Sequence, residues 1–138
     1  MLSAGATLAV VGSFLPWLSS GTVDRSSYDI LGLVDRLGFT PDGPISVVAR
    51  AWPLMPLMLT VAVVAVWWGW RRVGAAVGGV GGIYACGLGA AVAGAVPDTQ
   101  HISVGAAPVL TAVGGAVVIV GSLLTLVLGV PSAHANAR

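Results

Sequence analysis

The chain has 138 residues and a net charge of +1, with 57% hydrophobic and only 8% charged residues. Soluble domains carry roughly a quarter charged residues, so six basic and five acidic side chains cannot cover a water-exposed surface. This composition places the chain in a lipid bilayer and leaves no room for a second domain. The cations are all arginines and form no basic cluster, which argues against nucleic-acid binding. The single Cys86 excludes an intramolecular disulfide.

The first apolar run extends over residues 1–18 and contains no charged side chain. At ~1.5 Å per residue it just crosses a hydrocarbon core of ~30 Å. A cleaved signal peptide is the competing interpretation. There is no basic region before the run, and Trp17-Leu18-Ser19-Ser20 is a poor cleavage site. We therefore predict a retained transmembrane helix.

The extracytoplasmic loop at residues 19–51 is longer than most connections and contains a helix signal. Ser26 and Asp29 have the S-x-x-D spacing related to a capping box. Gly38 follows at the position of a C-terminal cap. Between these signals, four apolar residues recur at helical spacing: Ile30, Leu33, Val34 and Leu37. We predict a short amphipathic helix over residues 27–37, lying on the outer leaflet or capping the bundle.

This predicted helix has two interpretations. It contacts an extracytoplasmic partner or covers a cavity, or else it is a structural cap that shields the ends of the other helices. The structural interpretation is favoured, because amphipathic periodicity predicts that one helix face is buried but does not identify what covers that face. The candidate partner-contact residues are Tyr28, Asp29, Asp35 and Arg36.

Three further apolar runs complete the predicted fold, at about residues 52–70, 74–96 and 108–130. Pro53 and Pro56 fall in the first turn of the second run, where a helix tolerates proline. The few residues between the second and third runs require an antiparallel hairpin. The chain is thus predicted to be a single all-α domain, an integral membrane four-helix bundle with one amphipathic helix in its first outer loop.

Arginine and tryptophan positions predict the orientation. Arg71, Arg72 and Arg138 share one side without an acidic residue, so this side and both termini are expected in the cytoplasm. Indole rings settle at membrane interfaces, because the ring is apolar and its N–H needs a polar partner. The expected interface anchors are Trp17 and Trp52 on the outer side and Trp67, Trp68 and Trp70 on the inner side.

Small residues recur along the apolar runs and predict close helix packing. In lipid, helices associate through close backbone approach, which glycine permits. This spacing fits packing within the chain, the more common case, and also fits self-association or the binding of a partner. The predicted helix-packing residues are Gly74, Gly78, Gly82, Gly114 and Gly121.

The sequence contains no recognisable catalytic or cofactor-binding motif. None of the apolar runs has an ionisable residue of the kind that ion-coupled transporters place at membrane depth. No nucleophile–base arrangement or phosphate-binding loop can be assembled. Asp98 and His101 supply two possible metal ligands, but an exposed polar turn explains them better. We expect no enzyme activity, no cofactor and no bound metal.

Several short motifs resemble small four-span membrane proteins of actinobacteria, a largely uncharacterised group. In those proteins a first helix ending in Leu-Pro-Trp precedes a loop with Ser-Gly and Arg-Ser-Ser-aromatic motifs. The resemblance implies the plasma membrane of a mycobacterium-like or streptomycete-like cell, and it carries over no functional residue. The motifs are Gly12-Ser13-Phe14-Leu15-Pro16-Trp17, Ser20-Gly21, Arg25-Ser26-Ser27-Tyr28 and Arg50-Ala51-Trp52.

Two main functions fit these expectations, beside a third in which the chain is an envelope sensor that uses the outer loop and needs a partner for its output. The first is a non-enzymatic accessory or scaffolding subunit of a cell-envelope complex, with the bilayer and another membrane protein as partners. The alternative is a small pore or passive transport protein that self-associates along the glycine-rich third and fourth runs.

Overall fold

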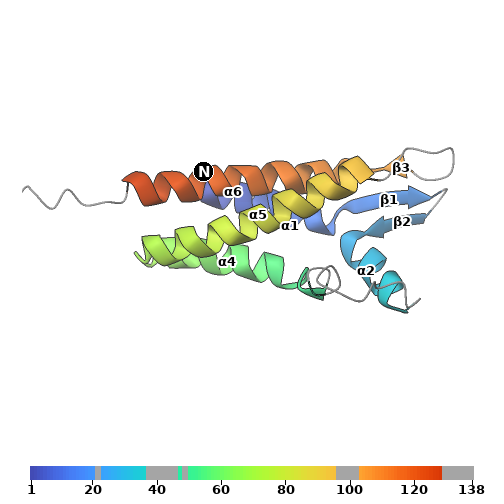
Figure 1. Ribbon diagram of the computed structural model, residues 1–138, viewed down its shortest axis with the longest axis horizontal. Coiled ribbons are helices and arrows are strands. Elements are labelled where there is room, and N and C mark those ends of the chain that lie inside the picture. The colour runs from blue at the N-terminus through green and yellow to red at the C-terminus, as the bar shows by residue number, and fades with distance from the viewer. Residues whose placement is uncertain (21–22, 37–46, 48–49, 96–102, 129–138) are drawn as a thin grey trace, which may run out of the picture.

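The computed structural model describes residues 1–20, 23–36, 47, 50–95 and 103–128. Four helices run along the length of an elongated body (Figure 1): α1 (Leu2–Phe14), α4 (Leu54–Trp67), α5 (Arg71–Ala95) and α6 (Ala107–Leu128). α5 packs against α4 and α6, α6 packs against α1, and α1 also contacts α4. The predicted helical fold class is therefore confirmed, although a small sheet accompanies the helices.

The helices differ in length from the predicted spans. α5 and α6 have 25 and 22 residues and are long and apolar enough to cross a membrane, by length and composition. α1 and α4 have only 13 and 14 residues. They are each ~20 Å long, against a hydrocarbon core of ~30 Å. The predicted helical spans 1–18 and 52–70 are therefore too long.

Proline and glycine explain where the two short helices end. Leu15 is extended (φ −71°, ψ 162°), as expected for the residue before a proline. Pro16 therefore ends α1 two residues earlier, at Phe14. Gly69 has a φ of +91°, which glycine adopts without steric cost. It turns the chain directly from α4 into α5, so the predicted hairpin between the second and third runs is present.

A three-stranded antiparallel sheet lies at one end of the body, and sequence analysis missed it. Its strands are β1 (Pro16–Ser20), β2 (Val23–Ser26) and β3 (Ser103–Val104), in the order β2-β1-β3 (Figure 1). The Ser20-Gly21 dipeptide, which begins at the last residue of β1, was the available sequence signal for a turn. β3 has only two residues and pairs with a strand from the far end of the sequence, so local patterns do not predict it.

The amphipathic helix of the outer loop is present as α2 (Ser27–Arg36), within one residue of the predicted end. The Ser26 hydroxyl and backbone N–H donate to the Asp29 carboxylate at 2.7 and 3.0 Å. The backbone N–H of Asp29 donates in return to the Ser26 hydroxyl at 3.4 Å. These reciprocal bonds form the predicted capping box and start the helix.

The five predicted packing glycines all lie where two helices approach closely. A Cβ on Gly74 would lie 2.7 Å from the Ala62 carbonyl oxygen of α4, and one on Gly82 would lie 2.9 Å from the Gly115 carbonyl oxygen of α6. Gly78 faces Ser122 of α6, while Gly114 and Gly121 of α6 face Ala9 and Leu2 of α1. All five positions are therefore used for contacts within the chain.

Candidate functional site

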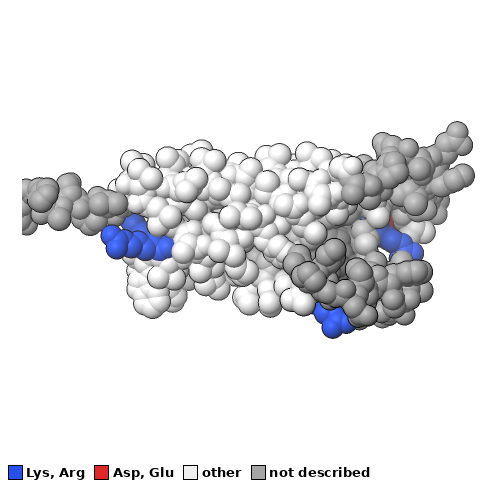
Figure 2. Space-filling view, viewed as in Figure 1, with Lys and Arg blue, Asp and Glu red and all other residues white. Residues whose placement is uncertain are grey.

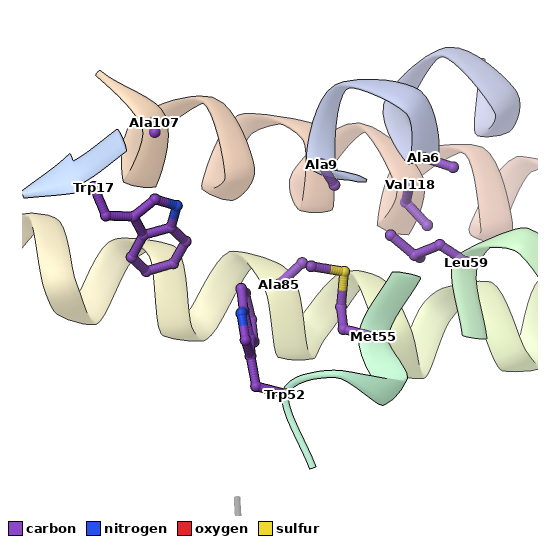
Figure 3. Close-up of a cluster of buried hydrophobic side chains, with 9 residues drawn as sticks. All are labelled: Ala6, Ala9, Trp17, Trp52, Met55, Leu59, Ala85, Ala107 and Val118. Carbon is purple, nitrogen blue, oxygen red and sulfur yellow. The ribbon is translucent and has the colours of Figure 1, made fainter. Parts of the chain in front are cut away.

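Three of the motifs quoted above meet where α1 ends and the sheet begins: residues 12–17, 25–28 and 50–52. With Tyr84 of α5 they form a cluster, called here the cap cluster, that consists of the buried Ser13, Trp17, Ser27 and Trp52 and the partly buried Tyr28 and Tyr84. The Trp17 and Trp52 rings meet edge to face at 5.4 Å beside α5, as Figure 3 shows. Trp52 also contacts the Tyr84 ring of α5 at 5.6 Å. The cluster joins α1, the sheet, α2, α5 and the start of α4.

Hydrogen bonds within the cap cluster satisfy the C-terminal end of α1. The last carbonyls of any helix lack partners within the helix. Here the Trp17 indole N–H donates to the Gly12 carbonyl at 2.9 Å, and the Ser27 hydroxyl donates to the Ser13 carbonyl at 2.6 Å. The Trp52 indole N–H in turn donates to the Ser27 hydroxyl oxygen at 2.9 Å. These donors are all committed to the fold, so the cluster is a structural cap.

Trp17 and Trp52 differ from their expected role as interface anchors. Their side chains are only 2% and 0% exposed, so neither ring is available at the surface. Sequence analysis placed them at an interface because they lie at the ends of apolar runs. It did not foresee that a sheet and α2 would cover those ends. Ser13, Ser27 and Tyr84, which complete the cap cluster, were missed for the same reason.

The other three tryptophans are exposed at the opposite end of the body. Trp67, Trp68 and Trp70 are 81%, 80% and 70% exposed, and they precede the exposed Arg71 and Arg72. This is the placement that interface anchors require. Exposure alone does not show a membrane, so their anchoring role stays a prediction.

Two of the four candidate partner-contact residues have roles within the chain. The Tyr28 ring packs on Phe14 at 5.0 Å, and its hydroxyl lies 3.4 Å from the Ser13 hydroxyl. Asp29 caps α2, and the hydrogen bonds from the Ser26 side chain and backbone lower the pKa of its carboxyl. Asp35 and Arg36 occupy the last turn of α2, and their side chains lie outside the described residues. These contacts favour the structural-cap interpretation of α2.

The remaining polar groups offer little for catalysis. As expected for hydroxyls in helices, those of Thr7, Thr60, Thr111 and Thr125 donate to the carbonyl four residues earlier. The exception is Ser122, whose buried Oγ has no hydrogen-bond partner. No group of three or more His, Cys, Asp or Glu side chains occurs within the described ranges. Asp98 and His101 lie outside those ranges.

An open groove lies along α4 and the start of α5. It has a volume of about 570 Å³, and we call it the α4 groove. A groove of about 280 Å³ runs between α1 and α4. Neither of these grooves is lined by an ionisable side chain. A further hollow of about 410 Å³, beside the start of α1 and the end of α6, is lined by Arg71. The residues that line the α4 groove are Thr60, Val61, Val64, Ala65, Trp68, Trp70 and Val73.

Comparison with protein-family models, with curated proteins and with solved structures finds no match to this chain. The resemblance to small actinobacterial membrane proteins is therefore still a prediction. The functional interpretation depends on the geometry described above.

Proposed function

We propose that the chain is a four-span integral protein of a bacterial plasma membrane, with both termini in the cytoplasm, and that it serves as a non-enzymatic accessory or scaffolding subunit of an envelope complex. The observation that carries this proposal is the distribution of surface charge. On the face shown in Figure 2, the charged side chains of the described residues lie toward the two ends of the body.

The surface between the two ends carries exposed apolar side chains on α4, α5 and α6. Exposed side chains include Val61 of α4 (47%), Val80 of α5 (59%), and Val109 and Val120 of α6 (51% and 47%). Soluble monomers rarely expose contiguous apolar patches larger than a few hundred Å². Hydrocarbon around the helices would remove the free-energy cost of exposing these side chains. This surface, called here the apolar belt, therefore supports a membrane location.

The cap cluster explains how two short helices fit this proposal. Non-helical backbone is tolerated at membrane depth only where protein covers it. The chain leaves α1 at Phe14 and enters α4 at Leu54, and the buried Trp17 and Trp52 lie within three residues of these two ends. The cap cluster would thus close the outer end of a bundle in which α1 and α4 stop short of the boundary.

A supporting role fits better than a self-associating pore. The pore hypothesis needs the glycine-rich faces of α5 and α6 to meet another copy of the chain. Gly82 of α5 and Gly115 of α6 already pack against each other, and Gly114 packs against α1. Within α5, Gly87 and Gly94 have nothing within 4 Å of an added Cβ, so this outward face and α2 are the surfaces available to a partner.

Extraction in a mild detergent tests the accessory role. We expect the tagged chain to migrate on a native gel in a complex larger than the free chain, with a second membrane protein identified by mass spectrometry. Gly32 lies in α2, is exposed and has nothing within 4 Å of an added Cβ. Gly32→Arg should therefore leave the fold intact and remove the partner if α2 is the contact.

The companion substitution is Gly94→Arg on the outward face of α5, the other surface available to a partner, where an added Cβ also meets nothing. Loss of the partner in the Gly94→Arg variant alone would indicate that the partner binds α5 instead of α2. Recovery of only the free chain under several mild conditions would contradict the accessory role.

A further inference from the structure

The α4 groove has a chemical character that points to one class of occupant. Its volume is about 570 Å³, and its lining is aliphatic and aromatic apart from Thr60. The Thr60 hydroxyl donates to the Pro56 carbonyl at 2.8 Å and is not free to donate to a ligand. From Thr60 to Trp68 the groove extends ~12 Å along the helix. Such a groove fits a hydrocarbon chain.

The end of the groove nearest the turn has a different character. Trp68 and Trp70 line it there, on either side of the Gly69 turn. Both rings are more than two-thirds exposed, at 80% and 70%. Within the described part of the chain neither indole N–H has a hydrogen-bond partner. Two hydrogen-bond donors are thus available where the hydrocarbon section ends.

The charges beyond the tryptophans are positive and have no described counterpart. Arg71 and Arg72 are exposed and directly follow Trp70. Neither lines the α4 groove itself, and Arg71 lines a separate hollow beside the first residues of α1 and the last turns of α6. The acidic residues described in strands and helices are Asp24, Asp29 and Asp35, which lie in β2 and α2 at the other end of the body (Figure 1). α5 begins at Arg71, so the positive end of its dipole adds to the same field. This end is therefore complementary to an anion.

From this arrangement we propose that the α4 groove binds one acyl chain of an anionic phospholipid, whose phosphate lies against Arg71 and Arg72. The inference builds on the proposed membrane location, because the lipid would come from the cytoplasmic leaflet. It adds a lipid-binding site that the accessory role does not require. Trp68 and Trp70 flank the junction between the chain and the headgroup, and their N–H groups donate to ester or phosphate oxygens.

Native mass spectrometry of the detergent-extracted protein, with equal amounts of phosphatidylglycerol and phosphatidylcholine, tests the site. We expect phosphatidylglycerol to be retained at least about fivefold over phosphatidylcholine, the factor that one basic residue contributes at an anionic surface. Replacing both arginines with glutamine should abolish this preference. Replacing both with lysine should preserve it, because the charge is kept.

A matched pair of substitutions tests the groove itself. Val61 lines the α4 groove and Val120 does not, and both side chains are 47% exposed. Val61→Trp fills the groove and should remove both lipids, whereas Val120→Trp should retain them, with unchanged circular dichroism in each. Glycerol phosphate, which carries the anion without a chain, should not displace the lipid.

Three results would overturn the lipid site: equal retention of the two lipids, identical behaviour of the Val61 and Val120 variants, or displacement by glycerol phosphate. A dimer peak lost in Val61→Trp would also overturn it, because a second copy would then occupy the groove. If the protein needs detergent and still shows no lipid preference, only this inference fails. If it stays dispersed without any amphiphile, the membrane proposal itself fails.

Discussion

Gly114→Ala should destabilise the protein by about 1–3 kcal/mol, the usual cost of overpacking a tight contact. A Cβ at this position would lie 2.8 Å from the Ala9 Cα of α1. The obstacle is backbone, which has no other rotamer to adopt, so α1 and α6 must separate. Unfolding in mixed micelles with increasing SDS, followed by circular dichroism, measures the change.

Gly87→Ala is the control for this substitution. Gly87 lies in α5 and has nothing within 4 Å of an added Cβ, so only the intrinsic preference for alanine over glycine in a helix acts there. That preference is worth roughly 0.5–1 kcal/mol, and the variant should be unchanged or stabilised. Equal destabilisation of the two variants would show that α1 and α6 do not meet at Gly114.

Ser27→Ala should cost about 1–3 kcal/mol, because it leaves buried polar groups without partners. The Ser13 carbonyl loses a donor, and the Trp52 indole N–H loses its acceptor. The same SDS titration measures this cost. Ser19→Ala is the matched control, because the Ser19 hydroxyl bonds only to Asp24 at an exposed site. Exposed substitutions of this kind usually change stability by less than about 0.5 kcal/mol.

A double-mutant cycle with Trp52→Phe tests whether the two residues act together. Phenylalanine has no N–H, so Ser27→Ala no longer strands a donor when Trp52 is replaced. The double variant should therefore be less destabilised than the sum of the single variants, by about 1 kcal/mol. Strict additivity would indicate that the Ser27–Trp52 hydrogen bond is absent in solution.

The sequence was most informative where structure is set by neighbours along the chain. The Ser26–Asp29 spacing and the apolar stripe that begins at Ile30 located α2 almost to the residue. In the same way, the short polar segment around Arg71 required the hairpin between α4 and α5. The spacing of Gly74, Gly78 and Gly82 placed all three at helix contacts, because glycines four residues apart let another helix backbone approach closely.

Prediction failed where structure is set by contacts between distant segments. β1 is held by β2 on one side and by β3 on the other, and β3 lies far along the sequence. Trp17 and Trp52 were expected at a surface because a tryptophan at the end of an apolar run resembles an interface anchor. Contacts with α5, the sheet and α2 bury them in the assembled fold, and no local pattern reports that burial. α1 and α4 are shorter than predicted for a related reason, since the residues that follow α1 and precede α4 belong to the cap cluster instead of the helices.

The most direct test of the membrane proposal is the reactivity of cysteines placed on the apolar belt, in a Cys86→Ser background. Val80 is 59% exposed on the surface of the protein, so Val80→Cys would react readily if water surrounded it. In intact membranes we predict that a charged maleimide labels Asp24→Cys and leaves Val80→Cys unlabelled, and that both react after solubilisation in SDS. Labelling of Val80→Cys in the intact membrane as fast as Asp24→Cys would contradict the proposal.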